Sequence, residues 1–331
     1  MPFHQRAQFH PAAAVAAWAL GVVLLSNSTG IRADAAAPPA DAPPADDPAI
    51  EMLKPLDRGR DLASQQVTDF ANWLDSFFGD DRIYQESQNS RLTLNLLHVN
   101  REGKQPRYDA NVQGKLTLPN TERRVKLLFE SNQEDRQAQD ASLLDTVDSQ
   151  EQSVGLRFIK KTTAWWRAHT DIGVRFRGGL DSFVRFRLRR LFELGPWNLR
   201  VTQSLFWYDS TGPGETTRFD AEWRIATSYL FRASSQATWL DQNRYFDLSQ
   251  YFFLFHDISR RRAVIYQAGV IGVTEPDPQT RSYALSARLR QQLHRDWLFF
   301  EISPRIDYLR ENTFQPQRSL TLRLEVIFGA T

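Results

Sequence analysis

Residues 218–229 read RFDAEWRIATSY, and apolar and polar side chains alternate along them. One side of this run carries Phe219, Ala221, Trp223 and Ile225, whereas the other side is mostly charged. Successive side chains of a β-strand point to opposite faces of a sheet, so the alternation indicates a strand with one apolar and one charged face. The run therefore predicts a sheet that separates two different environments.

The same period of two continues from Ser90 to Phe328 and predicts an all-β domain over residues 84–331. Several runs exceed the usual globular strand of about 5 or 6 residues and match the roughly 9 to 11 residues of a strand that crosses a membrane. We predict an antiparallel up-and-down transmembrane β-barrel of about 14 strands, with about 12 as the alternative. The predicted strands are 91–99, 107–118, 123–131, 151–160, 165–177, 182–190, 197–208, 217–227, 233–241, 247–258, 262–273, 281–293, 296–308 and 318–328.

The predicted connections alternate in length. Short ones include 259–261 and 294–295, whereas 132–150, 209–216 and 274–280 are longer and polar. Outer-membrane barrels have short turns on the periplasmic rim and longer loops on the extracellular rim. The short connections and both chain ends are therefore expected on the periplasmic side.

Aromatic residues stand near the ends of many predicted strands, as at 207–208, 245–246 and Trp297. This placement is typical of the aromatic girdles at membrane interfaces. On these grounds the chain resembles bacterial outer-membrane β-barrel proteins as a class, over about residues 90–328. The resemblance implies an outer-membrane location after export, and contact with outer-membrane lipid.

The last predicted strand also resembles the signal that the barrel-assembly machinery reads in such proteins, because residues 324–328 end in the aromatic Phe328. Two features depart from the common pattern: residues 329–331 follow Phe328, and Arg323 stands where glycine is common. The resemblance implies the assembly machinery as a partner during biogenesis.

The N-terminal part differs in composition from the alternating region. Residues 1–35 read as a secretory signal peptide, with an apolar stretch over 12–25 and small residues at 33–35. An uncleaved amphipathic leader is the alternative. Residues 36–56 are rich in proline and alanine, and we expect a disordered linker there.

Residues 57–83 are predicted to form a periplasmic amphipathic helix, because apolar residues recur at helical spacing before Gly79. In one interpretation the helix docks on the barrel as a lid or lies at a membrane surface. In another it is a plug inside the barrel or a handle for a periplasmic protein partner. The residues that define its apolar face are Phe70, Trp73, Leu74 and Phe77.

If the apolar faces of the strands meet lipid, their charged faces line the lumen. The predicted basic lining is Arg175, Arg177, Arg185, Arg187, Arg189, Arg224, Arg288 and Arg290. The predicted acidic lining is Asp220, Glu222, Glu301, Asp307 and Glu325. A barrel of this size is wider than the roughly 8-stranded kind that side chains fill, and narrower than porins of about 16 to 18 strands. Two interpretations stay open: a structural salt-bridge network, or a narrow channel that favours anions.

Composition excludes several kinds of chemistry. The 331 residues contain no cysteine, which excludes disulfides, thiolate metal sites and a cysteine nucleophile. Lys and Arg total 41 against 39 Asp and Glu, so net charge does not point to nucleic acid. Zinc-protease and serine-hydrolase motifs are missing from the sequence. We predict no catalytic residue, metal or cofactor.

The sequence thus predicts a non-enzymatic outer-membrane β-barrel, either a narrow solute channel or a membrane scaffold for a periplasmic partner. A barrel enzyme acting on membrane lipid, of the phospholipase or lipid A deacylase type, is one alternative. A soluble periplasmic β protein is the other.

Overall fold

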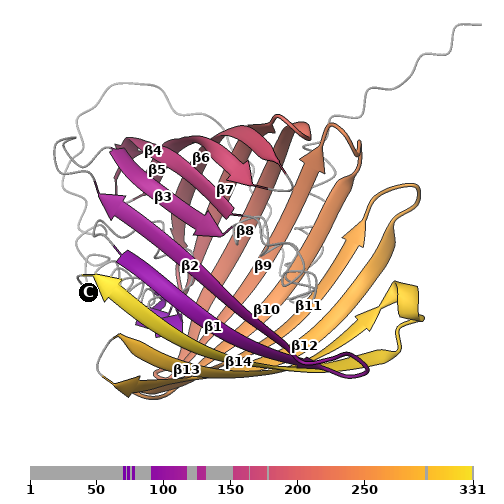
Figure 1. The fold of residues 1–331 in the computed structure, drawn as a ribbon. Coiled ribbons are helices and arrows are strands. Elements are labelled where there is room, and N and C mark those ends of the chain that lie inside the picture. Colours follow the sequence, from indigo (N-terminus) through magenta and orange to yellow (C-terminus); the bar gives the residue numbers. More distant parts are fainter. Residues whose placement is uncertain are drawn as a thin grey trace, which may run out of the picture. The chain divides into compact units, whose positions relative to one another are not determined.

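The computed structural model describes residues 70–71, 73–74, 77–78, 91–117, 125–131, 152–163, 165–176, 179–294 and 297–329. Within these residues fourteen antiparallel strands form one closed barrel (Figure 1). The strands are β1 (Arg91–Arg101), β2 (Arg107–Thr117), β3 (Val125–Ser131), β4 (Gln152–Thr162), β5 (Trp166–Phe176), β6 (Leu180–Leu194), β7 (Trp197–Tyr208), β8 (Gly212–Ala226), β9 (Tyr229–Leu240), β10 (Phe246–Ser259), β11 (Arg262–Val273), β12 (Gln279–His294), β13 (Leu298–Leu309) and β14 (Pro316–Gly329). The predicted up-and-down barrel is confirmed, with fourteen strands rather than twelve.

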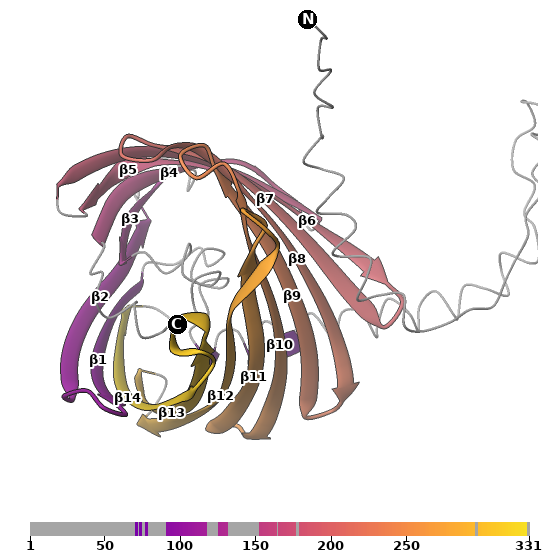
Figure 2. The ribbon, with the colours of Figure 1, turned by 90° about the vertical axis from the view of Figure 1, so that its right-hand side faces the viewer.

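The barrel is closed by its first and last strands. β1 pairs with β14 without interruption, from Arg91 opposite Gly329 to Arg101 opposite Ser319. Every other strand pairs with its neighbours in sequence, as the ring of ribbons in Figure 2 shows. Closure pairs the backbone groups of what would otherwise be two free sheet edges, which is what a sheet needs to cross a membrane.

The connections alternate between two rims, with short turns on the rim where β1 begins and β14 ends. Residues 195–196, 227–228 and 260–261 make such turns, whereas the opposite rim includes residues 102–106 and the 3-10 helix η2 (Arg310–Asn312). The predicted signal peptide over 1–35 and linker over 36–56 lie outside the described residues.

Several predicted boundaries are wrong because the strands run past the alternating region. The predicted loop over 209–216 shrinks to residues 209–211, since β7 and β8 stay paired up to Tyr208 opposite Gly212. Likewise β9 begins at Tyr229 instead of residue 233. Backbone pairing at the rims does not depend on an apolar face, so the period of two fades before the hydrogen bonds end.

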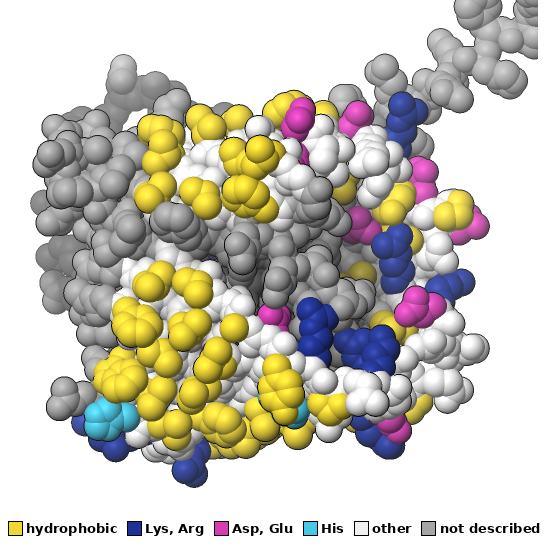
Figure 3. Space-filling view, viewed as in Figure 1, with side chains coloured by type: hydrophobic (Ala, Val, Ile, Leu, Met, Phe, Trp, Pro, Cys, Tyr) yellow, Lys and Arg dark blue, Asp and Glu magenta, His cyan; other side chains and the backbone are white. Residues whose placement is uncertain are grey.

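The barrel wall has an apolar outer face and a charged inner face, which is the reverse of the arrangement in a soluble protein. Apolar side chains on the outer face, such as Leu96, Ile172, Leu205 and Leu285, are exposed. Figure 3 shows many such side chains gathered on the face in view. Charged side chains are instead among the most buried of the described residues, including Arg157, Asp171, Arg290 and Asp307. An apolar exterior around a charged interior is the pattern of a barrel in a bilayer.

Glycines on the inner face lie beneath aromatic rings. Gly155 on β4 is directly opposite Gly173 on β5, and the ring of Phe183 from β6 lies over both. In the same way the ring of Tyr251 lies over Gly269 on the neighbouring strand β11. Each ring takes the space that a side chain at the glycine position would fill.

Candidate functional site

The charged lining of the barrel interior is the candidate site. Arg290 on β12 reaches over β13 to Glu325 on β14, which places both side chains on the concave inner face. By strand alternation, six other predicted basic residues share the inner face of their strands, namely Arg175, Arg185, Arg187, Arg189, Arg224 and Arg288. Arg177 lies outside the described residues.

Asp171 on β5 is the centre of the first ion-pair cluster. Arg157 on β4 donates to both of its carboxylate oxygens, at 2.7 and 2.8 Å, and Arg185 on β6 donates at 2.8 Å. Both arginines are directly opposite Asp171 in the strand register. One carboxylate thus links three adjacent strands through two guanidinium groups, an arrangement that suits the bidentate geometry of arginine.

A second contact lies nearer the loop rim of the same wall. Arg175 donates to Asp181 at 2.9 Å, and its guanidinium lies 4.0 Å from the ring centre of Tyr208. The backbone N–H of Ser210 also donates to Asp181 at 2.9 Å. These bonds tie the residues between β7 and β8 to β6.

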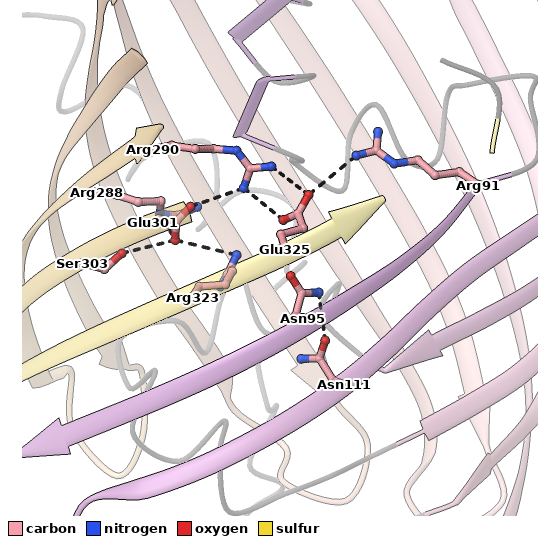
Figure 4. A network of polar contacts seen from close by, with 9 residues as sticks. All are labelled: Arg91, Asn95, Asn111, Arg288, Arg290, Glu301, Ser303, Arg323 and Glu325. Carbon is pink, nitrogen blue, oxygen red and sulfur yellow. Dashed lines mark hydrogen bonds and ion pairs between the residues drawn. The ribbon is translucent and has the colours of Figure 1, made fainter. Parts of the chain in front are cut away.

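Arg290 on β12 is the centre of a larger network near the closure of the barrel (Figure 4). Its two terminal nitrogens lie 2.7 and 3.0 Å from the carboxylate oxygens of Glu325, and one of them is 3.6 Å from Glu301. Glu301 also lies 3.8 Å from both Arg288 and Arg323. The network combines side chains of β12, β13, β14 and, through Arg91, β1 across the closure of the barrel.

The remaining predicted carboxylates are paired within their own part of the wall. Asp220 accepts from Arg218 at 3.0 Å and from the Ser234 hydroxyl at 2.7 Å. Glu222 accepts from Arg232 at 2.8 Å. Asp307 lies 2.7 Å from Arg305.

Arginine exceeds carboxylate on the inner face of β5, β6 and β7. Six arginines occupy it against three carboxylates. Arg167 lies directly opposite Arg189 and is close enough to Arg200 for the two charges to repel each other. The arginines are Arg167, Arg175, Arg185, Arg187, Arg189 and Arg200, and the carboxylates are Asp171, Asp181 and Glu193. This wall is therefore electropositive.

At the short-turn rim, the inner face of β9, β10, β11, β13 and β14 is apolar. This region, which we name the collar, is a set of lumen-facing side chains packed into one cluster. Its residues are Leu230, Phe253, Phe255, Ala263, Ile265, Phe299 and Ile327. Sequence reasoning did not single out the collar, yet a signal existed, because Leu230, Phe299 and Ile327 each stand two positions from a lumen charge.

Helical residues pack against the collar. The described residues of the predicted helix, namely Phe70, Ala71, Trp73, Leu74, Phe77 and Phe78, adopt helical conformation and belong to the same cluster or contact it. The bounds 57 and 83 of that prediction lie outside the described residues. Among the residues that the structure describes, no helix has the length and apolarity needed to span a membrane.

In the described part of the chain, no three His, Asp or Glu side chains gather as metal ligands would. The histidines there have other contacts. His98 packs on Tyr108 with ring centres 4.6 Å apart, and His256 stacks on Tyr229 at 4.3 Å.

A closed antiparallel barrel with an apolar exterior and a charged lumen defines the class: the chain has the fold of bacterial outer-membrane β-barrel proteins. Solved structures similar to it include the outer-membrane channel DcaP of Acinetobacter baumannii, with 5% identity, a TM-score of 0.43, and coverage of 72% of this chain and 96% of that one. OmpT of Vibrio cholerae has 8% identity and a TM-score of 0.46, over 72% of this chain and 97% of that one. OccK11 of Pseudomonas aeruginosa has 10% identity and a TM-score of 0.41, over 73% and 96%. No family model and no curated protein matches the sequence.

Proposed function

We propose that this protein is an outer-membrane channel that favours anionic solutes, inserted in outer-membrane lipid by the barrel-assembly machinery. The observation that carries the proposal is the excess of six arginines over three carboxylates on the inner face of β5 to β7. Fixed charges of one sign in a lumen raise the local concentration of the opposite ion and exclude ions of like sign.

Arg187 and Arg189 are the best residues on which to test the proposal. Neither is fully buried, and Arg187 donates a 3.0 Å hydrogen bond to the Ser204 hydroxyl. Replacing both by glutamine removes two positive charges from the lumen and keeps polar side chains in their place.

The double variant Arg187→Gln, Arg189→Gln is expected to lower the anion-to-cation permeability ratio by at least about fivefold. An anion about 8 Å from one unit charge in water gains about 0.5 kcal/mol, so two charges contribute about 1 kcal/mol. The measurement is the reversal potential of the full mature chain in a planar bilayer under a potassium chloride gradient.

Arg190→Gln is the matched control, because Arg190 is on the same strand but on the lipid-facing side. Its guanidinium lies 4.6 Å from the ring centre of Trp166 and 4.4 Å from that of Phe192. Its loss should leave the reversal potential unchanged. An unchanged reversal potential in the double variant as well, or cation selectivity in the wild type, would overturn the proposal. Silence of the folded barrel, both intact and with its helical residues substituted, would favour the scaffold interpretation.

A further inference from the structure

The collar is an unusual surface for an aqueous lumen. Leu230 and Ala263 are completely buried, and Phe255 is 2% exposed. Apolar side chains that face water are unfavourable, so a patch of them on the wall of a solute path needs a cover. The described helical residues supply that cover, since Leu74 and Ala71 belong to the same buried cluster.

The cover is built from stacked aromatic rings. Phe70 stacks on Trp73 with ring centres 5.9 Å apart, and Trp73 stacks on Phe77 at 5.4 Å. Phe77 then meets Phe299 of the collar edge-on, with ring centres 5.8 Å apart and planes at 90°. Edge-on and offset contacts of this kind add to the stability that burial itself provides.

Three lumen arginines lie against aromatic rings of the helical residues and of the collar. Arg224 lies 4.5 Å from the ring centre of Phe70. Within the collar, Arg232 lies 4.8 Å from the ring of Phe255, and Arg290 lies 4.3 Å from that of Phe299. One lumen arginine thus contacts a ring of the helical residues directly, and two others lie against collar rings.

The contact can be broken without disturbing the barrel. The fourteen strands pair with one another around the whole ring, so no strand needs the helical segment as a hydrogen-bonding partner. Cysteine is absent from the sequence, so no disulfide holds the segment in the lumen. Among the described residues, side-chain packing joins Ala71, Leu74, Phe77 and Phe78 to the collar.

We propose that the described helical residues, namely Phe70, Ala71, Trp73, Leu74, Phe77 and Phe78, form an aromatic plug that closes the lumen at the short-turn rim, and that the channel conducts only when this plug leaves the collar. The inference rests on the proposed channel function and adds its regulation. The seated plug is the closed state, and any condition that binds or displaces the plug shifts the population toward the open state.

The first test weakens the plug. The variant Trp73→Ala, Phe77→Ala removes two stacked rings that are buried only in the closed state, so the open fraction in a planar bilayer should rise by about tenfold or more. The matched control is Phe314→Ala, which removes a partly exposed ring outside the collar cluster. Retarded migration of unheated samples on detergent gels confirms that each variant is folded.

The second test locks the plug. Because the chain has no cysteine of its own, Phe77→Cys and Phe299→Cys place the only two thiols on either side of the contact. A short cleavable bifunctional thiol reagent should silence this variant, and cleavage of the linker should restore current in the same bilayer. Each single-cysteine variant is the control and should keep its current after the same treatment.

The outcomes separate the plug from the channel. If wild type and the weakened plug variant carry equal anion-selective current, and the cross-link changes nothing, the plug proposal is overturned while the channel proposal stands. If weakening the plug produces current without anion selectivity, the plug proposal stands and the channel's anion preference fails. If folded wild type and folded plug variants are all silent, both proposals fail.

Discussion

Replacing Arg290 by leucine is expected to destabilise the folded barrel by about 3–5 kcal/mol, because the change leaves two buried carboxylates without their shared cation. Glu325 accepts two hydrogen bonds from Arg290, and Glu301 lies 3.6 Å from the same guanidinium. Both carboxylates are almost completely buried. The measurement is the midpoint of denaturant unfolding of the detergent-folded protein.

Arg288→Leu is the matched control for this change. Arg288 is on the same strand and contacts the same Glu301, but its distance is 3.8 Å and its side chain is 29% exposed. An ion pair with solvent access contributes about 0–1 kcal/mol, so the control should unfold close to the wild-type midpoint. Equal midpoints for Arg290→Leu and Arg288→Leu would mean that the network does not stabilise the closure between β12 and β1.

The substitution Gly173→Ala should also lower stability, at or above the usual range of about 1–3 kcal/mol for overpacking. A Cβ at this position would lie 2.7 Å from the Cα of Gly155 and 2.9 Å from the Phe183 ring, and closer still to the carbonyl oxygen of Val154. Two of these three groups are backbone of the paired strand β4, which can yield only if its pairing with β5 opens. Denaturant unfolding measures the loss.

Gly179→Ala provides the comparison, because a Cβ there meets nothing within 4 Å and its backbone needs no left-handed conformation. The denaturant midpoint of this variant should equal that of the wild type. A wild-type midpoint for Gly173→Ala would show that the close approach of β4 and β5 at this point is relaxed in the membrane protein. Partial recovery in the double variant Gly173→Ala, Phe183→Ala would separate the ring contact from the backbone contact.

The period of two was sufficient to predict the class of fold, because one face of each strand must meet lipid while the other faces the lumen. Strand ends were harder to predict. β8 begins at Gly212, within a segment rich in glycine and proline. These residues are typical of turns, so the sequence predicted a loop there instead of a strand. The chain there still pairs with β7, since hydrogen bonding in the backbone is independent of side-chain polarity.

The lumen charges follow from alternation, but their partners do not. Asp171 meets Arg157 and Arg185 because the register of β4, β5 and β6 places the three opposite one another. Register depends on the turn residues between strands, and a one-residue slip would send these side chains to lipid. Arg290 and Glu325 are two strands apart, a contact that depends on side-chain length and barrel curvature rather than on any sequence spacing.

The collar could not be predicted from the alternation of apolar and polar residues. Phe299 and Ile327 have the same alternation as the charged lining, and the sequence analysis did not single them out. Their apolar character is explained by the described helical residues, which pack on them from elsewhere in the sequence. The aromatic composition of the helical residues was visible, but the surface that they bind was not.

The glycine beneath Tyr251 makes the bore of the barrel adjustable. A ring that lies over a glycine on the next strand occupies space next to the wall that a side chain there would fill. Where the backbone leaves room, as beneath the Tyr251 ring at Gly269, a side chain in place of the glycine would swing the ring inward and narrow the passage. In the proposed channel, the size limit for solutes could thus be altered at a position that carries no charge, independently of the arginines proposed to attract anions.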